Sequence, residues 1–113
     1  MSRRPSRAEN DGRSAVFATL LRKLSKKGFY PIFLFVEGAG ESGVHYNDVL
    51  RYALSHKVVE SRASVTAALN ALTDLKMLER TVSSERPVRT IYRTSKRGKA
   101  VSQRLREIEK EVS

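Results

Sequence analysis

The fold is decided by residues 61–93, which read SRASVTAALNALTDLKMLERTVSSERPVRTIYR. Ser61 can cap the first free backbone N–H groups of a helix, and apolar residues then recur at helical spacing toward a core. These apolar residues are Val65, Ala68, Leu69 and Leu72. The pattern predicts an amphipathic helix over residues 61–77.

The opposite face of this helix is small and polar. On a helical wheel it collects Ala63, Thr66, Ala67 and Asn70, flanked by Arg62 and Ser64. Such a face offers hydrogen-bonding groups without bulk that would hold the backbone away from a partner. It suits the floor of a DNA major groove.

Two β-branched runs follow, at residues 78–82 and 88–93, on either side of the polar segment 83–87. This pattern predicts a β-hairpin. A helix with a hairpin fits a generic α+β fragment as well as a DNA-reading unit. Charge favours the second interpretation, because residues 78–99 hold seven basic and two acidic side chains, a net charge of +5.

Length and composition set the broad class. A chain of 113 residues forms one core and can fold without covalent staples. Cysteine is absent, which excludes disulfides and thiolate metal sites and fits a reducing compartment. No apolar run approaches the roughly 20 residues that span a bilayer, and no signal-peptide core follows Met1. We therefore expect a cytoplasmic protein that is not embedded in a membrane.

The net charge of +10 is the strongest compositional signal, with 22 Lys and Arg against 12 Asp and Glu. Such an excess attracts polyanions, of which nucleic acid is the commonest. An acidic membrane surface is the other candidate, but membrane-active basic helices carry bulky aromatic residues on one face. The basic helix near the N-terminus has no Trp and only Phe17.

The N-terminal region divides into an arm and a helix. Residues 1–13 hold four arginines and no apolar periodicity, which predicts a flexible basic arm ahead of one domain at residues 14–113. This arm is either a solvated tail or a contact to phosphates or a minor groove, and both interpretations stay open. Residues 14–27 then predict a helix with a basic end, stopped by Gly28.

The apolar run at residues 32–36 is compatible with a buried strand or a short buried helix. Pro31 suits the first turn of a helix, so we expect a helix. Residues 38–43 then spell GxGxxG, a pattern that cradles pyrophosphate in dinucleotide-binding proteins. Three residues separate it from the next helix, and Glu37 and Glu41 would repel a pyrophosphate, so a glycine-rich connector is the plainer interpretation.

Asn47 is a suitable N-cap for a helix over residues 48–54, and residues 55–60 link that helix to the amphipathic one. Two capped helices joined by a linker predict a helix-turn-helix. His45 and His56 have no cysteine or carboxylate at ligand spacing, and no nucleophile elbow appears. We therefore expect no metal, no cofactor and no enzymatic activity.

Ser95 caps a last predicted helix over residues 95–113, whose apolar residues form one stripe. Such a stripe packs on its own domain or pairs with a second copy. Together with the apolar face of the first helix, it favours a homodimer. The candidate interface residues are Val16, Leu20, Val101, Leu105, Ile108 and Val112.

Three motifs in order resemble winged-helix transcriptional regulators, in particular the HxlR-like and MarR-like groups. Residues 61–72 look like the capped recognition helix of that family, with two leucines three apart. Residues 77–80 are similar to the start of its wing, and residues 92–98 to the segment that ends the wing and opens the last helix. Two departures are Lys76, where the family has glycine, and Thr94, where it has leucine.

The resemblance implies a dimeric regulator that binds duplex DNA. The expected fold is α+β, mainly α: a winged helix-turn-helix with a recognition helix at residues 61–77, a wing at 78–93 and extra N- and C-terminal helices for dimerisation. The chain lacks the N-terminal cysteine of redox-sensing members of this family, which argues against thiol sensing.

The leading hypothesis is therefore a homodimer that binds double-stranded DNA sequence-specifically. Asn70 and Arg62 are candidates for base contacts, and Ser64 and Thr66 for hydrogen bonds to phosphates or bases. The remaining candidates are Ala63 and Ala67 for thymine methyl groups and Arg80, Arg86 and Arg89 for the basic wing. Two alternatives remain, a chromatin-type protein that coats DNA without sequence preference and a protein–protein interaction module whose charge serves solubility.

Overall fold

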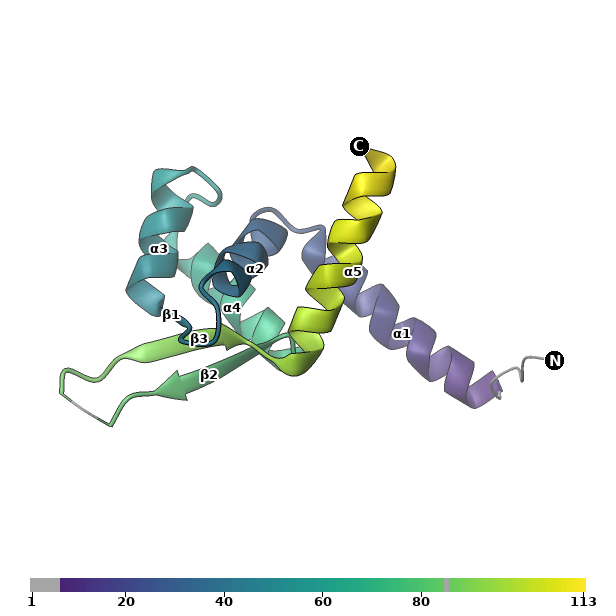
Figure 1. Cartoon of the computed structure of the whole chain (residues 1–113), viewed down its shortest axis with the longest axis horizontal. Helices are drawn as coiled ribbons and strands as arrows, with labels where there is room; N and C mark the ends of the chain where they lie inside the picture. Colours follow the sequence, from purple (N-terminus) through teal and green to yellow (C-terminus); the bar gives the residue numbers. More distant parts are fainter. Residues whose placement is uncertain (1–6, 85) are drawn as a thin grey trace.

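The chain folds as a set of helices packed on one small antiparallel sheet (Figure 1). The computed structural model describes residues 7–84 and 86–113. In chain order the elements are α1 (Arg7–Leu24), α2 (Phe29–Gly38), β1 (Val44–His45), α3 (Tyr46–Ser55), α4 (Arg62–Asp74), β2 (Leu78–Val82), β3 (Thr90–Thr94) and α5 (Lys96–Val112).

The core lies where α2, α3 and α4 meet the sheet. The predicted apolar stripe of α4 is buried there, with Val65, Ala68, Leu69 and Leu72 all at 0% exposure. Burying one such aliphatic side chain stabilises a fold by about 1.5–3 kcal/mol. From the other elements the core receives Ile32, Phe33 and Val36 of α2, Val49 and Ala53 of α3, and Leu78 and Tyr92 of the hairpin.

The ambiguous apolar run at residues 32–36 is helical, which confirms the predicted helix. The preceding Gly28 has φ 88°, a left-handed conformation that glycine adopts without strain, and it turns the chain from α1 into α2. Pro31 is the third residue of α2, where its missing N–H would have no partner inside the helix. Five elements pack around α2, namely α1, α3, α4, α5 and β3, so a largely apolar sequence suits it.

The sheet has the order β1-β3-β2, and β1 was not predicted from the sequence. Val44 lies opposite Tyr92 and His45 opposite Ile91, so β1 adds a third antiparallel strand to the predicted hairpin. The glycine-rich segment forms the turn between α2 and β1. Gly43 has φ 76°, and a Cβ there would lie 2.8 Å from the carbonyl oxygen of Tyr92, so only glycine fits so close to β3.

The structure corrects three predicted boundaries near the N-terminal half. Helix α1 begins at Arg7 rather than Ser14, so the predicted arm is helical from there on, and its first six residues lie outside the described part of the chain. The segment combines Arg, Ala and Glu, which favour helix, with a single glycine that does not outweigh them. The same helix ends at Leu24 rather than Lys27.

The third correction concerns the start of α3, where the N-cap is His45 and not Asn47. The pairing of His45 with Ile91 keeps the backbone of His45 extended, and the helix begins directly after it, at Tyr46. Asn47 therefore lies inside the first turn. The caps predicted for the other two helices are confirmed, because Ser61 Oγ accepts from Ser64 N and Ser95 Oγ accepts from Gly98 N.

The C-terminal half of α5 makes polar contacts to both ends of α2. Arg106 Nη2 donates to Glu37 Oε2 over 2.6 Å, and Tyr30 Oη donates to Glu109 Oε2 over 3.1 Å. Burial, together with the hydrogen bond to Glu109, raises the pKa of the Tyr30 phenol, which therefore keeps its proton and stays a donor. These contacts tie the C-terminal half of α5 to α2.

Candidate nucleic-acid interface

The exposed face of α4 carries five of the residues predicted to contact DNA. The helix turns its aliphatic stripe into the core, which leaves the opposite face in solvent. The exposed residues of that face are Arg62, Ala63, Thr66, Ala67 and Asn70. Because four of these side chains are small, a flat partner could approach the helix backbone closely.

Ser64 differs from its neighbours because it belongs to the helix cap. Its side chain is partly buried, its backbone N–H donates to Ser61 Oγ, and the two serine hydroxyls lie 3.0 Å apart. Its hydroxyl therefore already has a partner at the start of α4. The prediction of a polar contact to DNA rests on its remaining hydrogen-bonding capacity.

The hairpin β2–β3 presents exposed arginines. Arg80, Arg86 and Arg89 are exposed, and within the described part of the chain none of them takes part in a salt bridge. Arg93 is different, since its Nε lies 3.8 Å from Glu79 Oε2 and its Nη2 donates to Thr81 Oγ1 over 3.4 Å. Among the described residues, the arginines of the wing without an ion pair are therefore Arg80, Arg86 and Arg89, and not Arg93.

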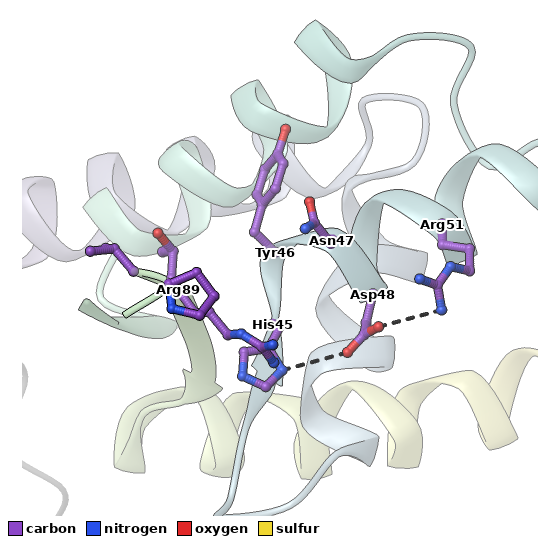
Figure 2. A pocket seen from close by; sticks show the side chains of 9 residues that line it. His45, Tyr46, Asn47, Asp48, Arg51 and Arg89 are labelled. Carbon is purple, nitrogen blue, oxygen red and sulfur yellow. Dashed lines mark ion pairs between the residues drawn. The ribbon is translucent and has the colours of Figure 1, made fainter. Parts of the chain in front are cut away.

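A polar cleft joins this hairpin to the start of α3 (Figure 2). It encloses about 490 Å³ and is lined by His45, Tyr46, Asn47, Asp48, Arg51 and the segment 87–90. Asp48 lies between two basic groups, 3.7 Å from His45 Nδ1 and 3.7 Å from Arg51 Nη1. Arg89 faces the same cleft, so positive charge prevails there.

Sequence reasoning missed the residues of this cleft on α3. They come next to the wing because β1 pairs with β3, and a strand of two residues is too short to show any periodicity. The available signal was Gly43 followed by the β-branched Val44, two positions ahead of the helix. The cleft therefore adds Tyr46, Asn47 and Arg51 to the candidate surface.

Tyr46 connects the cleft to the exposed face of α4. Its hydroxyl oxygen lies 2.7 Å from Thr66 Oγ1, and the guanidinium carbon of Arg62 lies 5.9 Å from the centre of its ring. Figure 2 shows Tyr46 pointing away from Asp48, toward a neighbouring helix. The α4 face, Tyr46 and the Arg89 side of the wing thus form one continuous surface, which we call the α4–wing surface.

The residues predicted for a dimer interface gather on a second surface. An apolar groove of about 660 Å³ lies between α1 and α5, and its lining includes Val16, Leu20, Val101, Leu105 and Ile108. Leu20, Val101 and Leu105 also pack against the core, whereas Val16 and Ile108 are 62% and 56% exposed. Val112 is not among the lining residues and is 79% exposed.

The described residues form neither a metal-binding cluster nor a membrane-spanning helix. In residues 7–84 and 86–113 no group of three or more His, Asp or Glu side chains is arranged to hold a metal ion. Within the same ranges, no helix combines the length and the apolar character needed to cross a membrane.

Comparison with known proteins gives a family match and two similar solved structures. Residues 50–113 match the profile of the HxlR-like helix-turn-helix family, and no curated protein matches the chain. A PadR-like transcription factor from Bacteroides fragilis superposes with a TM-score of 0.64 at 15% identity, covering 85% of this chain and 90% of that one. A MarR-family transcriptional regulator from Porphyromonas gingivalis W83 gives 0.63 at 18% identity, covering 96% and 94%. Both likenesses confirm the predicted winged-helix fold.

Proposed function

Because this chain belongs to the HxlR-like helix-turn-helix family of transcription regulators, we propose that it binds double-stranded DNA sequence-specifically as a homodimer. In this proposal α4 is the recognition helix and enters the major groove. The β2–β3 wing lies on the neighbouring minor groove or the phosphate backbone. Helices α1 and α5 hold the two copies together.

The single observation that carries the proposal is the composition of the α4–wing surface. A row of small, exposed side chains on α4 lies beside exposed arginines that have no salt bridge within the described residues. Small residues let a helix approach base edges closely, and unpaired arginines attract phosphates. A surface built only for solubility needs no such division between a small-residue helix and a cationic hairpin.

Each part of this surface has a separate role in the proposal. Asn70 can accept a hydrogen bond from N6 of adenine and donate one to its N7, and Arg62 can donate two to O6 and N7 of guanine. Arg86 and Arg89 neutralise phosphates, which positions the protein but carries no sequence information. Ala63, Thr66 and Ala67 also face the major groove, where the two alanines lie beside thymine methyl groups.

The homodimer is supported by the apolar groove between α1 and α5. Its rim exposes Phe17 and Leu21, at 57% and 49%, besides Val16 and Ile108. Contiguous apolar surface of this kind marks an interaction site in a monomer. A second copy offers the same apolar helices in return, and a twofold dimer would present two α4 helices to successive major grooves.

The proposal is tested by selecting bound sequences from a pool of random duplexes with the purified full chain. Recovery of one palindromic motif is the expected result, because a twofold protein reads two inverted half-sites. Duplex binding without any recovered motif would instead support a protein that coats DNA. Absence of duplex binding at low salt would contradict DNA binding and leave protein–protein interaction.

A further inference from the structure

We propose that Tyr46 is a positioning residue for base recognition, whose hydroxyl orients the hydroxyl of Thr66 so that Thr66 donates toward the DNA and whose ring holds Arg62 in place. The inference rests on the proposed function of the α4–wing surface. In this inference Tyr46 itself contacts neither the bases nor the phosphates of the DNA. Its effect passes through two neighbours on α4.

The position of Tyr46 is fixed by the sheet. It is the first residue of α3 and follows directly on His45, which pairs with Ile91 of β3. Its side chain is partly buried and packs against the hydrophobic core. The ring therefore stays beside α4 while its hydroxyl reaches the exposed face.

The direction of the hydrogen bond between Tyr46 and Thr66 decides what Thr66 can offer. The two oxygens lie 2.7 Å apart, and either can be the donor. Each hydroxyl has one hydrogen, so a Thr66 that donates to Tyr46 has only lone pairs left for a partner. When Tyr46 donates, it occupies a lone pair of Thr66 and turns the hydrogen of Thr66 away from Tyr46, toward a partner on the exposed face.

Duplex DNA favours the second arrangement. Its phosphates, the N7 and O6 atoms of guanine, N7 of adenine and O4 of thymine all accept hydrogen bonds. A phenol is also a stronger donor than an aliphatic alcohol, because it is the more acidic of the two. In the resulting chain Tyr46 donates to Thr66 and Thr66 donates to the DNA, and each bond polarises the next.

Arg62 is positioned by the ring of the same tyrosine. The guanidinium carbon lies 5.9 Å from the ring centre, within the range of a cation–π contact. Arginine has many rotamers, and a side chain that is already confined loses less entropy on binding. One aromatic residue thus prepares both a hydroxyl and a guanidinium of α4 before the DNA arrives.

The test compares the full chain with its Tyr46→Phe and Thr66→Val variants on the selected duplex. Tyr46→Phe removes only the hydroxyl and keeps the ring beside Arg62. Each variant should bind about three- to tenfold more weakly, and the double variant should bind no more weakly than either single one. In both variants the difference in affinity between alternative bases should shrink at the same base pair, which a loss of protein stability alone would not cause.

Tyr52→Phe is the matched control. Tyr52 is on the same helix, stacked on Phe35 with ring centres 4.2 Å apart, and its hydroxyl has no hydrogen-bond partner among the described residues. Its affinity should stay within about twofold of wild type, as expected for a substitution away from the interface. Tyr46→Leu removes the ring as well, and its additional loss relative to Tyr46→Phe should vanish in an Arg62→Ala background.

Wild-type affinity and base preference for Tyr46→Phe would overturn this role and leave the proposed function standing. So would losses for Tyr46→Phe and Thr66→Val that add fully in the double variant. A wild-type chain that binds no duplex would contradict both the proposed function and the positioning role of Tyr46. If Tyr46→Phe does not fold in a urea titration, Thr66→Val at its exposed position decides the matter: unchanged base preference there refutes the donor chain.

Discussion

Lys76 has an unusual backbone conformation at the end of α4. Its φ of 65° is left-handed, a region that glycine occupies far more easily, and it follows the last turn of α4. Lys76 N donates to Thr73 O and Met77 N donates to Leu72 O, the pair of bonds that closes a helix in a Schellman motif. The turn is therefore kept although the sequence departs from the glycine of the family.

A second lysine repeats this arrangement at the end of α3. Lys57 has φ 55°, its N–H donates to Leu54 O, and Val58 N donates to Ala53 O. We expect Lys76→Gly and Lys57→Gly each to raise the free energy of unfolding by about 1 kcal/mol, because glycine removes the left-handed strain. Urea unfolding followed by circular dichroism measures the change.

Lys99→Gly is the control for both substitutions. The same exchange inside α5 should lower the free energy of unfolding by about 1 kcal/mol, since glycine weakens a helix interior and the exchange also removes the exposed ion pair of Lys99 with Glu41. An equal loss of stability in all three variants would show that the left-handed lysines carry no strain.

Gly98 is the residue where a side chain has no space. A Cβ there would overlap the carbonyl oxygen of Met77, which also accepts from Ser95 N over 3.0 Å. Gly98→Ala should cost about 1–3 kcal/mol of stability through overpacking, measured by thermal and urea unfolding. Gly38→Ala is the counterpart, with nothing within 4 Å of the added atom, and it should not destabilise. Equal stability of the two variants would contradict the close packing of α5 on the α4–β2 turn.

At the scale of whole elements, sequence periodicity predicted the helix α4 and the hairpin better than it predicted where elements begin and end. Helix α4 and the β2–β3 hairpin follow from a four-residue aliphatic stripe and two β-branched runs, and both are confirmed, although β3 runs over Thr90–Thr94 and not over the predicted residues 88–93. The predicted end at residue 77 was three residues too long, because the Schellman turn closes α4 at Asp74. Apolar periodicity does not show where a helix stops when the next buried residues belong to a strand.

The missed elements share one cause, since each depends on contacts distant in sequence. Strand β1 has two residues and exists through its pairing with β3. That pairing in turn moves the N-cap of α3 from Asn47 to His45 and brings Tyr46 beside Thr66. No local pattern around residue 46 encodes a partner twenty residues away, so the link between the wing and α4 had to come from the structure.

The recognition helix and the wing should respond differently to mutation. Arg86→Ala and Arg89→Ala should weaken all duplexes similarly, because phosphate contacts are independent of sequence. Asn70→Ala should change the preference at one base position by about 1–3 kcal/mol and leave binding to unrelated duplexes almost unchanged. Affinities for a set of single-base variants of the selected site separate the two patterns.

Arg93→Ala is the control for the wing, because that guanidinium already contacts Glu79 and Thr81. Its effect on affinity should be smaller than that of Arg86→Ala or Arg89→Ala. If Asn70→Ala weakened every duplex equally, α4 would not be the element that reads bases.

The whole molecule is elongated, with extents of 56 × 34 × 23 Å. Its wing and the far end of α1 point to opposite ends of the long axis (Figure 1). The apolar groove between α1 and α5 is therefore well separated from the wing. A second copy could occupy that groove without covering the basic hairpin.

Charging this groove should separate the two copies. Val16→Glu and Ile108→Glu place a carboxylate where the proposal buries apolar surface, and an unpaired buried charge costs several kcal/mol. Sedimentation velocity should show a monomer for the variants and a dimer for the wild type. Leu54→Glu, at a 41% exposed leucine of α3 outside the groove, should remain dimeric. A dimer that persists in the groove variants would place the interface elsewhere.

The salt dependence of duplex binding tests the central claim most directly. Fluorescence anisotropy of the selected duplex, titrated with wild-type protein at several salt concentrations, measures how many phosphates the α4–wing surface neutralises. If six to ten phosphates are contacted, affinity should fall by about 10³ to 10⁵ between 50 and 200 mM salt. In Arg86→Ala the slope of log affinity against log salt should lessen by about one. Affinity that does not change with salt, or a slope untouched by removing Arg86 and Arg89, would contradict the account.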